Sequence, residues 1–556
     1  MNTKIYILCS MMAFVCFSCK KGFLDRNPYN GVSSSVIFTS DENARLAVNG
    51  IYQAAGQNAF KDQFLAVTTY MGPDSYTYGR GGVNLGTTFP MGLGTARENT
   101  IPAIYQNLYR PIVYANDVIA GLDDNENVSE ELRNRLIGEA KFLRGLCYFY
   151  LWNLFGDVVL FDKPTPVEET FLPRTPVAEV QALVISDFKD AAEKLPVSYT
   201  AADLGRATKG AAIAMLGKAY LYLQRWQEAE TEFAKLLTAP FTYDLTADFG
   251  ASFYWKTQNN KESVFELQYI NEQNMGSNFE RLFGNRSGGR GGENFCGAAM
   301  AAFRVFRNSD GSVIDISGYP KRSSYPTGNP GEVSYGIDLI KWYDETFKDA
   351  DIRLHQSVIM PGATFFGNDN KYYKVYWPYQ TYVGADPAAL RTDWTSIGWV
   401  PIRKFLTLGE ENIINAQTCP TNFPMIRFAD VLLMYAEAVN EGRGPVQEAY
   451  NAVNRVRTRA KVAGFPAGLN KEQMRREIQL ERYRELMFET HLFFDVKRWR
   501  LAHTTDPVFG LNNDVLDFRF ERLYTRKFTE NRDYLFPIPG AQIDLNPLLT
   551  QNPGWN

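Results

Sequence analysis

The sequence predicts a mainly α-helical protein, in which tetratricopeptide-like helix pairs form a scaffold and a loop-rich region containing short strands packs over it. Three observations predict this fold class. Apolar residues recur at helical spacing through residues 41–240 and again through 421–556. One predicted hairpin carries the residue pattern of a tetratricopeptide repeat. Between the two helical parts, residues 241–420 lose this periodicity and gain clusters of Gly and Pro.

The first 18 residues are predicted to be a lipoprotein signal peptide. Lys4 directly precedes a 13-residue apolar run, "IYILCSMMAFVCF", which is too short for an ordinary membrane span. Ser18 is a small residue directly before Cys19, as lipoprotein processing requires, although Cys16 stands where Leu is more usual. We therefore predict lipid attachment at Cys19 and a lipidated tether over residues 19–40. The alternative is a plain secretory signal with an incidental cysteine.

Three helices are predicted before the hairpin. The stretch "DENARLAVNGIYQAA" opens on Asp41 as its N-cap, and residues 131–156 form a long amphipathic helix closed by Gly156. A third helix is predicted to begin near Pro176.

The tetratricopeptide pattern lies in residues 209–237. It consists of Leu216, Gly217, Tyr220, Ala229 and Phe233. Gly217 and Ala229 are small where the two helices are predicted to cross, and Trp226 is predicted to lie in the turn. A single pair of this kind cannot bury its apolar face, so neighbouring helices should stack on it.

Residues 241–420 are predicted to be the loop-rich, ligand-binding part, with short strands such as "SVFELQYI". Helix returns at residues 425–442, 446–460 and 471–499, and the Pro- and Asn-rich tail after them is predicted to be extended. We expect three parts, residues 41–240, 241–420 and 421–556, to form one globular body.

Charge and cysteine content exclude several classes of protein. A net charge of -4 and a pI of about 5.7 give no basic face, which argues against nucleic-acid binding. After signal removal, Cys147, Cys296 and Cys419 remain beside Cys19, and they form no CxxC motif. Neither a disulfide framework nor a zinc site is predicted, and Cys147 is expected to be a small buried hydrophobic residue.

Catalytic motifs are also missing from the sequence. Glu481, Glu485 and Glu489 are spaced along one helix face and could be read as a glycosidase pair, which needs two acids across a cleft. The surrounding arginines favour the other interpretation, a ladder of ion pairs that holds helices together. No HExxH, GxSxG or phosphate-binding loop occurs. We therefore predict that the protein is not an enzyme.

Two Gly-rich segments, residues 72–90 and 279–295, are predicted to bind a glycan, because aromatic rings stack on sugars while Asp, Asn and Arg bind hydroxyl groups. The candidate residues are Asp74, Tyr76, Tyr78, Arg80, Asn84 and Phe89 in the first segment, Phe283, Arg286, Arg290 and Asn294 in the second, and also Trp377, Trp394 and Trp399. The alternative is that these aromatic residues only pin the loops to the scaffold.

Several long phrases carry a family resemblance. They are "CKKGFLDRNP", "EAKFLRGLCYFYLWNLFGDVVL", "IRFADVLLMYAEAVNEG", "ERYRELMFETHLFFDVKRW" and "LFPIPGAQIDLNPLLTQNPGW", which occur in this order from Cys19 to the tail. The chain resembles the SusD/RagB family of outer-membrane lipoproteins. It departs from the family pattern at Thr490 and Leu492, where Gly and Arg are frequent, and at Cys16.

The resemblance implies a scaffold of about four tetratricopeptide-like pairs. It implies a lipid-anchored protein of the outer membrane, facing the cell exterior, that binds oligosaccharides and delivers them to a TonB-dependent, SusC-like barrel transporter. In this family the ligand lies in loops that correspond to residues 72–97 and 275–300 here. No cofactor is implied, and a structural Ca²⁺ ion is compatible with the family but cannot be assigned to any residue.

Three other functions remain open at this point. A member of the same family that captures peptides would depend on backbone pairing more than on stacked aromatic rings. A surface glycosidase would release reducing ends from a polysaccharide. A purely structural repeat adaptor would bind other proteins and no small ligand.

Overall fold

The computed structural model describes most of the chain. The described residues are 37–77, 88–98, 100–284, 295–319, 341–360, 363–366, 372–376, 389–391, 400–407, 415–516 and 520–555, with the backbone alone described at 364–366, 372–376 and 389–391. The predicted signal peptide and lipid site at Cys19 lie outside these residues.

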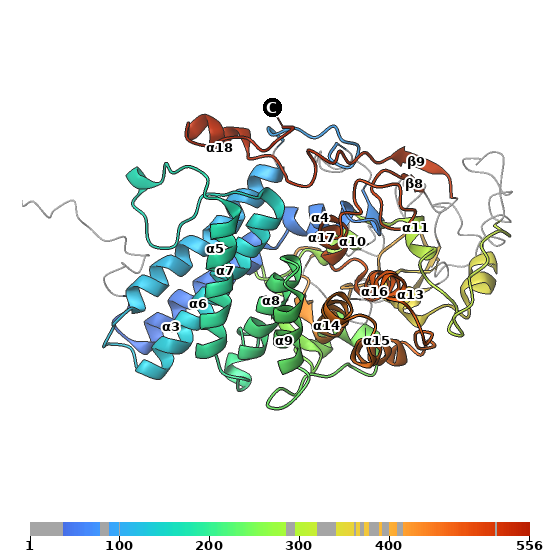
Figure 1. Ribbon diagram of the computed structural model, residues 1–556, viewed down its shortest axis with the longest axis horizontal. Coiled ribbons are helices and arrows are strands. Elements are labelled where there is room, and N and C mark those ends of the chain that lie inside the picture. Colours follow the sequence, from blue (N-terminus) through green and yellow to red (C-terminus); the bar gives the residue numbers. More distant parts are fainter. Residues whose placement is uncertain are drawn as a thin grey trace, which may run out of the picture.

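Four helix pairs form the scaffold, as predicted (Figure 1). Their members are α3 (Asp41–Ala54) with α5 (Thr100–Leu122), α6 (Glu130–Phe155) with α7 (Val177–Lys194), α8 (Lys209–Tyr222) with α9 (Trp226–Lys235), and α14 (Phe428–Arg443) with α15 (Gln447–Arg459). Helix α14 also packs against α8 and α9, so helices from both ends of the sequence share one continuous hydrophobic core. The fold is thus mainly helical and tetratricopeptide-like.

The ends of the first helices follow local capping chemistry. Ser40, rather than the predicted Asp41, is the N-cap of α3, because its side chain accepts a hydrogen bond from the backbone N–H of Asn43 at 3.3 Å. The Asp41 carboxylate instead accepts from the backbone N–H and the hydroxyl of Ser129, each at 2.9 Å. Helix α6 ends as predicted at Gly156, which adopts a φ of 72°.

The α8–α9 hairpin has the predicted crossing. A Cβ atom added to Gly217 would lie 2.7 Å from Cε1 of Phe233, so the absence of a side chain at Gly217 is what lets the two helices approach. Ala229 and Phe233 are fully buried at the crossing. Trp226, predicted to lie in the turn, is the first residue of α9.

Replacement of Gly217 by Ala is therefore expected to lower the free energy of unfolding by about 1–3 kcal/mol, because the new methyl group overpacks the crossing. Gly50→Ala is the matched control. Gly50 lies in α3 with nothing within 4 Å of its added Cβ, and Ala there should be neutral or stabilising. Urea unfolding of both variants measures the difference, and equal stabilities would contradict the tight crossing.

The helix predicted over residues 471–499 is two helices. Helix α16 (Lys471–Leu486) begins with a capping box between Asn470 and Gln473, and α17 (His491–Arg498) follows after a break. At the break, Phe488 and Thr490 adopt positive φ angles of 65° and 68°. The sequence there contains neither Gly nor Pro, so the ordinary helix-ending signals are missing.

Short elements make up the remainder of the described chain. The strand pairs are β1 (Ser75–Tyr76) with β3 (Gly297–Ala298), β2 (Ser263–Leu267) with β7 (Phe423–Arg427) and β8 (Asp514–Leu516) with β9 (Arg522–Thr525), and β4 (Thr364–Phe366), β5 (Tyr372–Tyr376) and β6 (Ala389–Arg391) form one sheet. The short helices are η1 (Ala55–Ala59), α4 (Gln63–Tyr70), η2 (Val167–Glu169), η3 (Ala201–Asp203), η4 (Phe249–Phe253), η5 (Trp255–Thr257), α10 (Phe279–Phe283), α11 (Met300–Phe303), α13 (Ile352–Ser357) and α18 (Gly540–Leu545). The predicted strand over "SVFELQYI" is confirmed as β2. In the tail, the predicted extended path is interrupted by α18 (Figure 1).

The interior also holds all three described cysteines. Cys147, Cys296 and Cys419 are buried free thiols, and burial confirms the prediction for Cys147. Within the part of the chain that the structure describes, no helix is long and apolar enough to span a membrane.

Candidate functional site

The three glutamates that could have formed a glycosidase site lie in the interior as ion pairs. Glu481 is 2.8 Å from a guanidinium nitrogen of Arg353, and Glu489 is 2.7 Å from Arg427. Burial by itself raises the pKa of Glu481, but the adjacent guanidinium groups outweigh burial and lower it to about 2. A general acid needs a raised pKa and an open cleft. The ion-pair interpretation of these glutamates is confirmed.

The predicted binding segments are anchored at one place in the fold. Strand β1 pairs antiparallel with β3, so that Ser75 faces Ala298 and Tyr76 faces Gly297. The backbone N–H of Ala298 also donates to the carbonyl oxygen of Val400 at 2.9 Å. One border of each of the segments 78–87, 285–294 and 392–399 therefore lies at this junction, although these borders are far apart in the sequence. We call this junction of β1, β3 and residues 400–401 the loop root.

Asp74 holds the first segment to the α16–α17 break. Its carboxylate accepts a hydrogen bond from the backbone N–H of Phe488 at 2.6 Å, and its backbone carbonyl accepts from Ala299 at 2.8 Å. Asp74 is only 3% exposed, and burial raises its pKa from 3.8 to about 6. The side chain is thus an internal anchor, and its predicted contact with a ligand would require it to leave this position.

Because the Asp74 carboxylate is buried, we expect the free energy of unfolding to depend on pH. Because the folded pKa is raised, the folded protein takes up a proton as pH falls from about 6 towards 3.8, and the wild type loses stability as pH rises through this window. Asp74→Asn keeps an acceptor for Phe488 and removes the charge. We expect it to raise the free energy of unfolding at pH ~7.5 by about 1–2 kcal/mol and to flatten its pH dependence.

Urea unfolding of the Asp74→Asn variant at several pH values measures this effect. Asp349→Asn serves as the control, because it makes the same substitution at an exposed side chain. A loss of stability in Asp74→Asn at pH ~7.5 would show that the ionised carboxylate stabilises the fold there.

Three other predicted ligand residues are also interior side chains. Tyr76 is 1% exposed and packs with Ala299 and Val515. The ring centroid of Phe89 lies 5.7 Å from that of Trp555, and Phe283 stacks on Phe279 with 5.9 Å between centroids. Buried rings cannot stack on a sugar from these positions. For these residues the structure corrects the prediction: they pin the loops to the scaffold, which is the alternative considered for them.

The other predicted site residues lie outside the described part of the chain. They are Tyr78, Arg80, Asn84, Arg286, Arg290, Asn294, Trp377, Trp394 and Trp399. For the segments containing Tyr78, Arg286 and Trp394, the structure shows that one border of each lies at the loop root.

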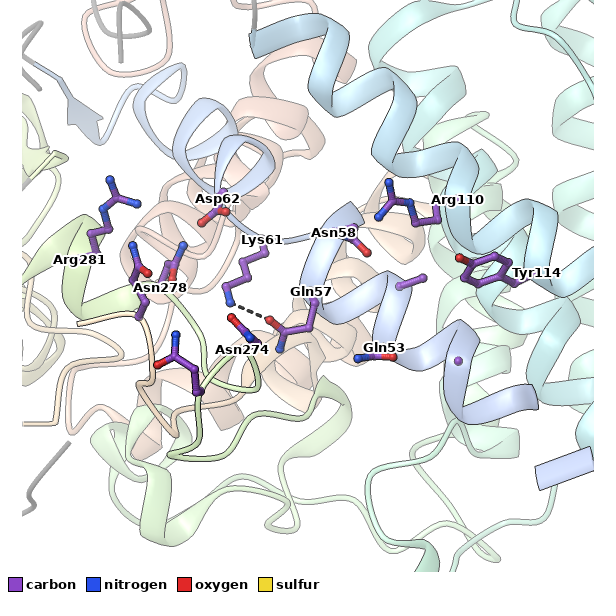
Figure 2. A pocket seen from close by; sticks show the side chains of 14 residues that line it. Gln53, Gln57, Asn58, Lys61, Asp62, Arg110, Tyr114, Asn274, Asn278 and Arg281 are labelled. Atoms are coloured by element: carbon purple, nitrogen blue, oxygen red, sulfur yellow. Dashed lines mark hydrogen bonds between the residues drawn. The ribbon is translucent and has the colours of Figure 1, made fainter. Parts of the chain in front are cut away.

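A second candidate site, missed by the sequence analysis, is an open pocket of about 510 Å³. Figure 2 shows that its walls come from the end of α3 with η1, from α5, and from the chain around α10. Seven amide side chains line it: Gln53, Gln57, Asn58, Gln273, Asn274, Asn278 and Gln417. We call it the amide pocket. The sequence signal that could have indicated it is the density of Asn and Gln in "QAAGQNAFKD" and "NEQN".

Metal ligands are not clustered in the described residues: no group of three or more His, Cys, Asp or Glu side chains there could hold a metal ion. The arrangement instead offers hydrogen-bonding groups at the amide pocket and a common anchor for three loops. This combination defines a helical-repeat protein with a polar pocket and, at a separate place, a junction that borders three further segments.

Comparison with known proteins identifies the family. The SusD family model matches residues 261–555, and a second model, described as "Starch-binding associating with outer membrane", matches residues 22–221. The first of these spans more than half of the 556 residues, and the chain belongs to the SusD family.

Individual relatives are similar along their whole length. SusD-like protein P25 of Formosa agariphila is 25% identical over 571 residues, with 100% of this chain and 98% of that protein covered. A SusD-like carbohydrate binding protein of Bacteroides fragilis superposes with a TM-score of 0.76 at 24% identity, covering 92% of this chain and 100% of that one. A laminarin binding SusD-like protein gives a TM-score of 0.62 at 20% identity, covering 93% and 100%. These structures share the fold.

Proposed function

We propose that this protein is a surface-exposed outer-membrane lipoprotein that binds oligosaccharides and delivers them to a TonB-dependent, SusC-like transporter. The observation that carries the proposal is the loop root, which gathers three segments rich in side chains suited to sugars. Within these segments, Tyr78, Arg286, Trp394 and their polar neighbours are the proposed ligand-binding residues. Binding residues are commonly carried on loops that a rigid scaffold holds at their base.

Relatives support a glycan as the ligand. One solved relative is a laminarin binding protein and another is a carbohydrate binding protein. The description of the second family model, which mentions starch binding and association with the outer membrane, supports the proposed location. The proposed lipid on Cys19 and the tether over residues 19–40 would attach the folded body to that membrane.

The buried ion pairs of Glu481, Glu485 and Glu489 support a binding role without hydrolysis. The peptide-capturing alternative differs from the proposal only in the ligand. One experiment tests the glycan-binding proposal and the peptide-capturing alternative. It uses the chain starting at Lys20, which retains every described residue.

The test is affinity electrophoresis of this chain through gels that contain neutral or acidic polysaccharides, with competition by a peptide digest. We expect one class of polysaccharide to retard the protein, no competition by peptides and no release of reducing ends. Retardation that peptides abolish would transfer the protein to the peptide-capturing group, and release of reducing ends would make it a glycosidase. Cys19→Ala in cells tests the anchor, because the variant should leave the membrane fraction.

A further inference from the structure

The amide pocket has an excess of positive charge. Its lining contains three cationic side chains, Lys61, Arg110 and Arg281, and one carboxylate, that of Asp62. In Figure 2, Arg281 lies at one end, Lys61 with Asp62 beside it lies in the middle, and Arg110 with Tyr114 lies at the other end. The cations are therefore spread along the pocket, so that an extended ligand would meet several of them. Its volume of about 510 Å³ is within the usual range of ~300–1,000 Å³ for small-ligand sites.

Asp62 is the one carboxylate of the lining that attracts Lys61 and Arg281, and it forms a contact ion pair with neither of them. The Nζ atom of Lys61 donates to the amide oxygen of Gln57 at 2.7 Å and to the carbonyl oxygen of Gly276 at 2.6 Å, and Lys61 is only 8% exposed. Arg281 lies over the ring of Phe295 at 5.7 Å. In the described chain, no carboxylate lies within ion-pair distance of Lys61, Arg110 or Arg281. Lys61 is the buried one of the three, whereas Arg110 is exposed and Arg281 is half-buried; among the other described buried cations, Arg353 for example is paired with Asp351.

A buried acceptor in the same wall lacks a donor. The side-chain oxygen of Asn278 is buried and has no hydrogen-bond partner among described residues, and Asn278 is 4% exposed. Buried polar atoms are rarely left unpaired, because each loses its hydrogen bond to water. A ligand hydroxyl group is the kind of donor that would satisfy the Asn278 oxygen. The pocket thus offers acceptors for hydroxyl groups beside cations for an anion.

Two features of the backbone and surface fit a binding site. Gln57 and Asn58 project from η1, a π-helical turn that continues α3, and such turns are frequent at functional sites. Tyr114 is 44% exposed at the far end of the pocket. An exposed ring beside polar groups is the usual platform for a sugar face.

We propose that the amide pocket binds an acidic saccharide, in which hydroxyl groups bond to Asn278 and the other amides while carboxylate or sulfate groups pair with Lys61, Arg110 and Arg281. The inference rests on the proposed function for a glycan cargo, and it assigns that cargo a second contact away from the loop root. A neutral glycan would leave the three cations unpaired, and an acidic peptide would bring too few hydroxyl donors for the amide-rich wall.

The test is calorimetric titration of the chain starting at Lys20 with three probes: an oligogalacturonate, a sulfated galactan oligosaccharide and neutral malto-oligosaccharides. An acidic peptide forms a fourth arm. We expect at least one acidic saccharide to bind at least about tenfold more tightly than the neutral probe, and its affinity to fall with added salt. The carboxylate and sulfate arms identify which anion the cations prefer.

Two variants connect that binding to the pocket. Arg110→Gln with Arg281→Gln should weaken the acidic probe by at least about tenfold, because two charge-assisted contacts are lost. The matched control is Arg225→Gln with Arg500→Gln, which removes the same charge from exposed ion pairs outside the pocket. Asn278→Ala should also weaken binding several-fold. The stability of the Asn278→Ala variant should change little, since the amide oxygen that it loses has no hydrogen-bond partner in the described chain.

The outcomes separate this inference from the proposed function. If acidic and neutral saccharides bind equally, or if the pocket variants bind the acidic probe like the control pair, the amide pocket is not the site. In that case binding that disappears in loop variants such as Tyr78→Ala would leave the proposed function intact. Binding of the acidic peptide alone, or of none of the saccharides, would overturn both.

Discussion

Replacing Arg427 with Met should lower the free energy of unfolding by about 3–5 kcal/mol, the largest loss that we expect from a single charged residue. Arg427 is 1% exposed and lies among three carboxylates. Its guanidinium group donates to Glu489 at 2.7 and 2.8 Å and to Glu485 at 3.1 Å, and it also pairs with Glu262. Without it, these carboxylates keep fewer cationic partners in an environment that excludes water.

The comparison that identifies the cause is Arg455→Met on the neighbouring helix α15. Arg455 is also paired, with Asp244 at 3.1 Å, but its side chain is 41% exposed. Water screens such pairs, so the loss should be below about 1 kcal/mol. Urea unfolding of the two variants gives the difference. If Arg427→Met were as mild as Arg455→Met, the buried ion pairs would not be what joins α14, α16 and the loop-rich part.

Phe405→Ala should cost about 3–5 kcal/mol of unfolding free energy, because it empties the centre of an aromatic cluster. The ring of Phe405 stacks on that of Phe279 at 4.3 Å between centroids and meets the edge of Phe253 at 5.3 Å. It also contacts Phe283, the buried residue at the start of the second predicted loop, at 6.4 Å. The cluster therefore fixes the base of that loop.

The same truncation at an exposed position shows whether burial of the ring causes the loss of unfolding free energy. Phe171→Ala removes the same atoms from a side chain that is 50% exposed, and it should change stability by no more than about 0.5 kcal/mol. Phe405→Leu should lie between the two, since most of the volume is kept. Thermal and urea unfolding measure the series, and a Phe405→Ala protein as stable as Phe171→Ala would contradict the role of the cluster.

Local sequence pattern was sufficient for the scaffold where periodicity and end signals agree. Helix α6 ends at Gly156 as its sequence indicates, and the small residue at Gly217 marks a true helix crossing. Helix α5 was not predicted; Pro111 lies in its interior, and Pro normally breaks a helix. Packing against α3 and α6 keeps α5 helical through that proline.

The site was less predictable, because its geometry depends on contacts between distant residues. A polar residue among glycines, such as Asp74, is typical of an exposed loop. Its carboxylate instead satisfies the N–H of Phe488, which is 414 positions away and is freed by a helix break without a sequence signal. The two-residue pairing of β1 with β3 is likewise invisible in either segment alone. Residue types indicated the right chemistry for the loops, but not which side chains are anchors.

The most direct test of the proposed function is calorimetric titration of the chain starting at Lys20 with the polysaccharide class that retards it, compared with the double variant Tyr78→Ala with Arg286→Ala. Both substitutions lie in segments bordered by the loop root and leave the buried anchors Asp74 and Tyr76 in place. The proposal predicts saturable binding by the parent chain and at least tenfold weaker binding by the variant, on the order of 1.4 kcal/mol, with unchanged unfolding. Equal affinities in the two proteins, or no saturable binding of any glycan by the parent chain, would contradict glycan capture at these loops.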